Sequence, residues 1–250
     1  MPRIRISDLI LYSLLFTAVI SFPFNMLPIP DWAKYLVRIS LSLLLLISYV
    51  FLIKRYQIKI IGNENKKNLL FLLPLIIVLP CNLLTLPFAI SIGINNTTIT
   101  SGIFFLELIL TILQAINEEI IFRLFIHSQL NIKNRLLKII ASSAIFAAMH
   151  LLNLINGFNP NVFIQVAYTF GLGLILGFIY EYGESIVTCF IYHTLFNVLN
   201  NVLFGLYIVP TITNVAYYTT ISVIAGIAII YTLCIYFFVF RKQERNYYYY

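Results

Sequence analysis

The sequence predicts an all-α fold, a polytopic membrane bundle of about eight transmembrane helices that forms one integral membrane domain over residues 1–250. Two observations carry this prediction. First, 61% of the residues are hydrophobic and only 10% are charged, whereas a soluble domain is about half apolar and about a quarter charged. Second, the apolar residues gather in runs long enough to cross a bilayer, so lipid must cover much of the surface.

Eight apolar segments approach the roughly 20 residues that a helix needs to cross the hydrocarbon core. We predict spans over residues 7–27, 36–53, 68–91, 102–126, 137–156, 161–180, 186–206 and 214–240. The third span contains Pro74, Pro80 and Pro87, which should kink it, and neighbouring helices can accommodate such kinks.

The basic residues lie in alternate loops between these segments. The basic loops and tails hold Arg3, Arg5, Lys54, Arg55, Lys59, Lys66, Lys67, Lys133, Arg135, Lys138, Arg241, Lys242 and Arg245. The intervening loops without Lys or Arg lie near 92–101, 156–160 and 207–213. By the positive-inside rule both termini are cytoplasmic, which requires an even number of spans. The loop at 181–185 is an exception because it carries Glu181 and Glu184, but acidic residues weigh little in this rule. The net charge of +7 therefore reflects topology, and no nucleic-acid partner is expected.

A few ionisable residues fall inside the predicted spans, where each costs about 2.5–3.5 kcal/mol on insertion scales. Apart from Asp8, Arg38 and Lys138, which lie within the first three residues of a span, they are Glu107, Glu118, Glu119, Arg123, His150 and His193. All lie in the fourth, fifth and seventh spans. Because such residues are costly in a bilayer, a functional site is their default interpretation.

The fourth span carries two consecutive glutamates followed by an arginine. Glu119 and Arg123 are four residues apart and share a helix face, so we expect them to pair. Glu118 is turned by about 100° and is left to face another group, where it is free to act as a base. The alternative is an ion cluster at the cytoplasmic interface, since the fourth loop follows closely.

The fifth and seventh spans each carry a histidine with an asparagine on the same face. His150 is followed by Asn153, and His193 by Asn197. A lone histidine in a span is more often a partner in helix–helix hydrogen bonding than a catalyst. Two histidines together with a glutamate pair favour a shared polar cavity.

This set of side chains suits hydrolysis of an amide by an activated water. Glu118 would take a proton from the water, assisted by His150. His193 and Asn197 would donate hydrogen bonds to the developing oxyanion. No serine or cysteine is spaced to pair with a histidine as a nucleophile. The prediction includes no metal ligand, but zinc stays open as an alternative, since two histidines and a glutamate can bind it although the HExxH motif is absent.

The three motifs together resemble those of the CAAX protease and bacteriocin-processing family of intramembrane proteases, also called CPBP or Abi. The pattern is EExxxR, then FxxxH, then HxxxN on successive helices. Here it stands as Glu118-Glu119…Arg123, Phe146…His150 and His193…Asn197. The resemblance covers about residues 115–200, within a catalytic core expected over about 102–206. The remaining spans match only in hydropathy.

The resemblance implies a helical membrane bundle with a conical cavity open to the cytoplasmic side. It implies that Glu118 and His150 act on the water, that His193 and Asn197 act on the oxyanion, and that Glu119 and Arg123 support them. Enzymes of this family have also been described as metalloproteases, so the resemblance leaves metal dependence open.

The family divides by substrate. One branch removes three residues from prenylated C-terminal CAAX motifs, and bacterial members are linked to bacteriocin self-immunity, peptide maturation or surface display. The expected partners are therefore the lipid bilayer and a peptide or lipidated protein substrate, with the oligomeric state left open. The chain lacks long soluble loops and is rich in Ile and Asn, which favours a multi-pass protein of the bacterial cytoplasmic membrane.

Two other functions compete with an intramembrane endopeptidase. A non-catalytic immunity or scaffolding protein of the same fold would bind a peptide or a partner without cleaving it. A proton-coupled transporter would also use buried carboxylates, but it should show repeated halves, and the sequence has no internal repeat.

Two smaller features complete the prediction. Gly173 and Gly177 form a GxxxG step on the sixth span, which predicts close helix packing within the monomer. His127 follows the fourth span and is expected at the interface, outside the site.

Overall fold

The computed structural model describes residues 4–60, 70–71, 101–158, 161–198, 223, 226–227 and 229–240. Every regular element in this part of the chain is helical. The elements are α1 (Ile6–Ser21), η1 (Phe24–Met26), α2 (Asp31–Tyr56), α4 (Ser101–Glu119), η3 (Ile120–His127), α5 (Arg135–Met149), η4 (His150–Asn156), α6 (Asn161–Gly183), α7 (Ile186–Asn197) and η6 (Tyr236–Phe240). The all-α prediction is confirmed for these residues.

Three described helices are long and apolar enough to cross a membrane: Asp31–Tyr56, Arg135–Ile155 and Gln165–Gly183. Shorter apolar helices cover Ser7–Val19, Ile186–Asn197 and Ile229–Phe238. Of the predicted third span, 68–91, all but residues 70–71 lies outside the described residues, as do most of 199–228. The count of eight spans therefore stays a prediction. The described helices support a membrane protein with several apolar helices.

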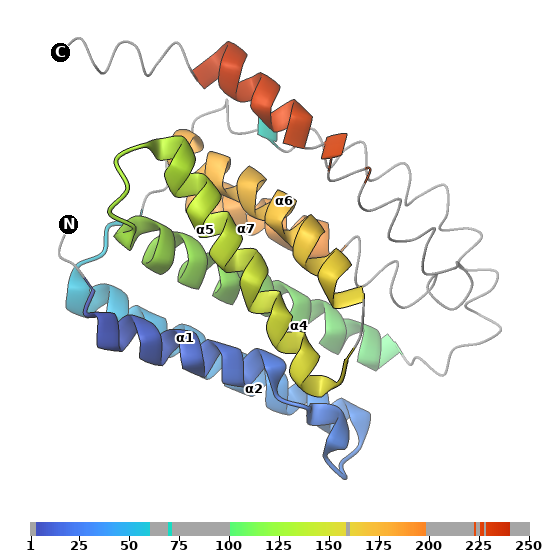
Figure 1. The fold of residues 1–250 in the computed structure, drawn as a ribbon. Coiled ribbons are helices and arrows are strands. Elements are labelled where there is room, and N and C mark those ends of the chain that lie inside the picture. The colour runs from blue at the N-terminus through green and yellow to red at the C-terminus, as the bar shows by residue number, and fades with distance from the viewer. Residues whose placement is uncertain are drawn as a thin grey trace.

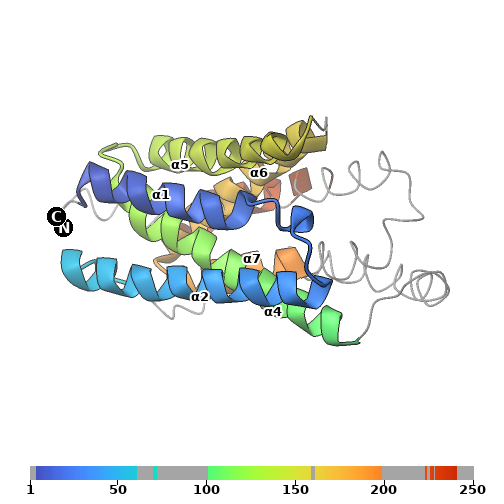
Figure 2. The same ribbon diagram turned by 90° about the horizontal axis from the view of Figure 1, so that it is seen from below.

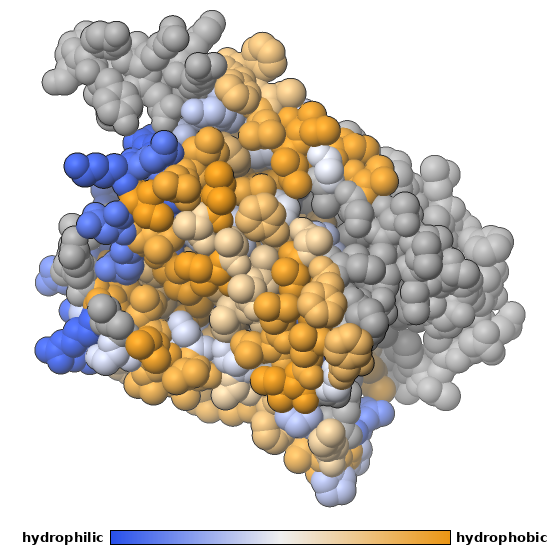
Figure 3. Space-filling model, in the orientation of Figure 1, coloured by the Kyte–Doolittle hydropathy of each residue, from blue (hydrophilic) through white to orange (hydrophobic). Residues whose placement is uncertain are grey.

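Helix α4 runs through the middle of the bundle, as Figures 1 and 2 show from two directions. It packs against α2 on one side and α7 on the other, while α5 packs against α6 and η3. The large side chains on the flank of α2 point outward, and Phe51 is 68% exposed. Figure 3 shows such hydrophobic side chains spread over the visible flank of the molecule, as expected of a surface that faces lipid.

The contact between α5 and α6 is unusually close. A Cβ atom at Gly173 would lie 3.0 Å from the Cβ of Ser143, and one at Gly177 would lie 2.8 Å from Cγ2 of Ile139. Only glycine allows the two helices to approach this far. The predicted close packing of the GxxxG step within the monomer is confirmed.

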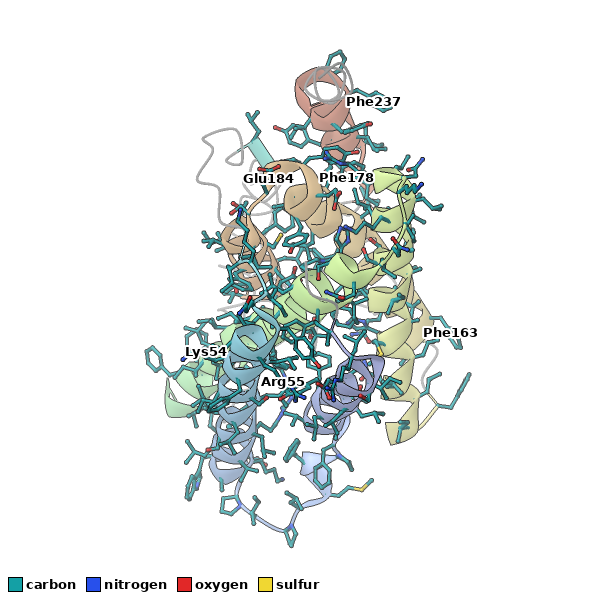
Figure 4. The ribbon with its side chains drawn as sticks, turned by 90° about the vertical axis from the view of Figure 1, so that its left-hand side faces the viewer. Lys54, Arg55, Phe163, Phe178, Glu184 and Phe237 are labelled. Carbon is teal, nitrogen blue, oxygen red and sulfur yellow. The ribbon has the colours of Figure 1, made fainter. Side chains whose placement is uncertain are left out.

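The basic segments of the described residues meet at one end of the bundle. The backbone N–H of Ile4 donates to Oε1 of Gln129 at 3.1 Å, and Arg55 lies 3.4 Å from Asp8. Hydrophilic side chains gather at this end in Figure 3. Figure 4 looks onto it and shows Lys54 and Arg55 at the end of α2 and Glu184 at the end of α6. The described parts of the N-terminal segment (4–5) and of the second loop (54–60) thus lie on one side. The fourth and sixth predicted loops lie on the same side, which an alternating topology requires.

Candidate active site

The two glutamates lie where the central helix changes its winding. Glu118 and Glu119 are the last residues of α4, and the backbone continues directly into the π-helical segment η3, which carries Arg123. π-Helical turns are rare and occur frequently at functional sites.

Glu119 is fully buried and binds two partners at once. Its Oε2 atom accepts a hydrogen bond from Nε of Arg123 at 3.1 Å, and its Oε1 atom contacts Nδ1 of His193 at 2.7 Å. The side chains of Glu119 and Arg123 are both 0% exposed. The predicted pairing of Glu119 with Arg123 is confirmed. The bond to His193 joins α4 to α7 and fixes the orientation of the imidazole ring.

Glu118 occupies a different environment. Its side chain is 14% exposed, and its Oε2 atom lies 3.5 Å from Nε2 of His193. Within the described part of the chain it forms no ion pair with Arg123, as its position on the helix predicted. His193 therefore stands between a closed carboxylate and an accessible one. We call Glu118, Glu119, Arg123 and His193 the glutamate cluster.

His150 lies next to this cluster, and the ring of Phe146 contacts both. Nδ1 of His150 donates to the backbone carbonyl of Phe146 at 3.1 Å, which leaves Nε2 as the atom with a lone pair in the neutral ring. The Phe146 ring makes edge contacts with His150 at 5.2 Å and His193 at 5.9 Å between centroids. The Arg123 guanidinium carbon lies 5.5 Å from the centroid of the same ring. All three motifs thus meet at Phe146.

The two asparagines differ in their surroundings. Asn197 is the last residue of α7 and is partly buried, and its side chain makes no hydrogen bond to any residue that the structure describes. Asn153 lies in η4, where its Nδ2 atom donates to Oε1 of Gln165 at 2.9 Å. Asn153 therefore ties η4 to α6. Asn197 lies one helical turn beyond His193, on the same face.

The donor set bears on the zinc alternative. Among the described residues, no group of three or more His, Cys, Asp and Glu side chains is placed to hold a metal ion. Both ring nitrogens of His193 face carboxylates, and Nδ1 of His150 is bound to a carbonyl. A catalytic zinc site needs three protein ligands converging on one point. Zinc-binding histidines usually bond a carboxylate or carbonyl through the other ring nitrogen, as both histidines do here, so the zinc alternative stays a question for experiment.

Two features were not predicted from the sequence. His127, expected at the interface, is fully buried, and its ring nitrogens lie 2.8 Å from Oγ of Ser142 and 2.8 Å from Oε2 of Glu181. Lys138 and Arg135 also bind Glu181. We call these five residues the end cluster. The acidic Glu181 beside a basic loop was the available signal for it.

The second unpredicted feature is Tyr49 of α2. It is 0% exposed, and its buried hydroxyl has no hydrogen-bond partner among the described residues. An aromatic residue in an apolar span carries no sequence signal that separates a site residue from one that only packs.

Residues 100–199 match the model of a family described as type II CAAX prenyl endopeptidase Rce1-like. The matched segment contains all three motifs and the whole glutamate cluster. Neither a curated protein nor a solved structure matches the chain significantly. Residues 100–199 are therefore similar to the Rce1-like family of CAAX-type peptidases, in agreement with the resemblance found from the motifs.

Proposed function

We propose that the protein is an intramembrane endopeptidase of the CAAX type that hydrolyses a peptide bond with a water activated by Glu118. The observation that carries this proposal is the contrast between the two glutamates. Glu119 is sealed and bound to Arg123 and His193, whereas Glu118 is 14% exposed and lies 3.5 Å from the same histidine. A general base must reach both substrate and water, and only Glu118 is accessible.

The proposed reaction uses the side chains of the three motifs. The water oxygen attacks the peptide carbonyl carbon while its proton moves to Glu118. Nε2 of His150, left with a lone pair by the bond at Nδ1, accepts the second hydrogen of the water. His193, with Nδ1–H bound to Glu119, acts in its imidazolium form, so its Nε2–H and the amide of Asn197 donate to the oxyanion. Glu118 then passes its proton to the leaving nitrogen as the C–N bond breaks, giving a carboxylic acid and an amine.

Glu119 and Arg123 act by positioning. An arginine and a carboxylate that are both buried hold each other in one geometry, and the carboxylate in turn holds the His193 ring. The proposed substrates are prenylated proteins with a C-terminal CAAX motif or membrane-associated peptides, as in bacteriocin maturation and self-immunity. We further propose a multi-pass orientation in a bacterial membrane with both termini cytoplasmic, on the basis of the basic end of the bundle.

The test is cleavage of a fluorogenic prenylated peptide ending in a CAAX sequence by detergent-purified protein. Glu118→Gln should lower kcat by at least about 10³-fold because it removes the general base, and it should leave the thermal midpoint unchanged. Glu184→Gln is the matched control, since Glu184 is an exposed carboxylate in the turn before α7, and it should keep wild-type activity. Equal cleavage by wild type and Glu118→Gln would overturn the proposal. No cleavage by either, with retained binding of the peptide, would favour a scaffolding or immunity protein.

A further inference from the structure

One face of α4 carries polar side chains through about three turns of the helix. The residues of this face are Glu107, Thr111, Gln114 and Glu118, and we call them the polar stripe. They follow one another at steps of three and four residues, so helical rotation keeps them within about 60° of one another. A polar side chain that faces lipid is costly, which makes the direction of this stripe informative.

The polar stripe faces the interior of the bundle. The exposed large apolar side chains of α4 are Phe105 and Ile109, which are 59% and 45% exposed, and helical rotation places them on the opposite face. Ala115, beside the stripe, is 0% exposed. Gln114 and Glu118 lie on this buried side and yet are only partly buried. Their remaining accessible surface therefore opens inside the bundle and away from lipid.

Helices α4 and α7 run antiparallel. The backbone of α4 continues through η3 to His127, whose ring lies 2.8 Å from Oε2 of Glu181 near the end of α6. Helix α7 begins shortly afterwards, at Ile186, and leads away from that end of the bundle. A step back along α4 and a step forward along α7 therefore reach the same depth.

This register places Gln114 opposite Asn197. Oε2 of Glu118 lies 3.5 Å from Nε2 of His193, which fixes the contact between the two helices at this level. Gln114 precedes Glu118 by one turn on the same face, and Asn197 follows His193 by one turn. Neither amide forms a hydrogen bond with a residue that the structure describes, so both are free to bind a ligand.

We infer that Gln114 is a substrate-binding residue, and that its amide binds the backbone of the peptide beside the scissile bond. This inference rests on the proposed function. A peptide group presents one N–H donor and one carbonyl acceptor, and a glutamine amide presents the complementary pair. Oε1 of Gln114 accepts from a backbone N–H of the substrate, and Nε2 donates to a backbone carbonyl. Asn197 binds the scissile carbonyl from the facing helix, so the two amides bind neighbouring peptide groups.

The first test compares two glutamines. With the fluorogenic prenylated CAAX peptide, Gln114→Leu should raise KM by about 10-fold and keep kcat within about two-fold of wild type, because the lost hydrogen bonds exist in both the ground state and the transition state. Its thermal midpoint should be unchanged or higher, since an inward amide without a partner is removed. Gln129→Leu is the matched control. Its Oε1 atom accepts from the N–H of Ile4 at 3.1 Å, so this variant should lower the thermal midpoint and keep the KM of wild type.

The second test uses peptides that are methylated at one backbone nitrogen at a time. At one position, methylation should raise the KM of wild type by about 10-fold, because a hydrogen bond to Oε1 of Gln114 is lost. The same methylation should change the KM of Gln114→Leu by less than about two-fold, because the acceptor is already absent. A purely structural glutamine would not produce this coupling between one side chain and one peptide nitrogen.

The outcomes separate this inference from the proposed function. If wild type cleaves, Glu118→Gln does not, and Gln114→Leu has the KM of wild type, Gln114 does not bind the substrate while the proposed function stands. The inference also fails if every methylated peptide affects wild type and Gln114→Leu equally, or if Gln114→Leu loses stability as Gln129→Leu does. If wild type and Glu118→Gln behave alike, both proposals are overturned together.

Discussion

The glutamate cluster and the end cluster both contain a buried histidine. They differ in whether all of their polar side chains have hydrogen-bond or ion-pair partners. In the end cluster, His127 has a partner at each ring nitrogen, and Glu181 binds His127, Lys138 at 3.3 Å and Arg135 at 3.5 Å. In the glutamate cluster, both terminal nitrogens of Arg123 are buried without a hydrogen-bond partner among the described residues. A second carboxylate, Glu118, is left accessible as well.

This difference separates a network whose polar groups have partners from one that is left open, as the proposed reaction requires. A buried polar network stabilises a fold when every member is satisfied, and it loses free energy when members are left unpaired. The end cluster ties η3, α5 and α6 together and has its partners. The glutamate cluster keeps unpaired donors and an accessible base, which a site for chemistry needs and a purely structural site does not.

The largest expected effect is that of Glu119→Gln. Removing this charge leaves the buried Arg123 cation uncompensated, which costs about 3–5 kcal/mol in the free energy of unfolding. Cleavage should also fall, because His193 loses the carboxylate that orients it. Denaturant unfolding in detergent and the peptide assay measure the two effects. If Glu119→Gln were as stable as Glu118→Gln, the contrast between a sealed and an accessible glutamate would be wrong.

Glu181→Gln tests whether the end cluster has a purely structural role. It weakens three contacts in the end cluster and should lower the free energy of unfolding by about 1.5–3 kcal/mol. At a temperature where the protein is folded, kcat should stay within about two-fold of wild type, because no residue of the glutamate cluster is touched. A large loss of kcat in the folded variant would show that the end cluster takes part in catalysis.

A pair of glycine substitutions sharpens the comparison, because α5 supplies residues to the end cluster and also carries Phe146, which contacts the glutamate cluster. A methyl group at Gly173 would press on Ser143 and Phe146, and one at Gly177 would press on Ile139. Each should cost about 1–3 kcal/mol by overpacking. Gly173→Ala should in addition lower kcat, since Phe146 contacts both site histidines, whereas Gly177→Ala should not. The same kcat for both variants would contradict the role given to Phe146.

The smallest expected effect is that of metal removal. Because the described His and Glu donors do not converge as three ligands, treatment with a chelator should change kcat by less than about two-fold. Zinc added back is the control. Loss of cleavage with chelator and its recovery with zinc would mean that the glutamate cluster rearranges around a metal during catalysis.

Helical periodicity was enough to predict the contacts within one helix and the close packing of two glycines. The pairing of Glu119 with Arg123 follows from their spacing of four residues, and the separate direction of Glu118 follows from the rotation per residue. Both are found in the structure. The number of spans, by contrast, depends on segments that lie outside the described residues.

Helical periodicity could not predict the contacts between side chains of different helices. His193 binds Glu119 and faces Glu118 because α4 and α7 meet at one depth and one rotation, and neither quantity is encoded in a local pattern. His127 was expected at the interface for the same reason, since its partners Ser142 and Glu181 come from two other helices.

The sequence by itself determined that this is an apolar helical protein. It also predicted ionisable residues in three of its spans, in motifs that resemble those of CAAX-type peptidases. Those properties depend on composition and on local spacing, which the chain carries along its length. The tertiary structure alone decided which glutamate is sealed, which is accessible, and that one histidine of a distant helix lies beside both. Accessibility depends on the relative rotation and depth of packed helices, which many side chains set together.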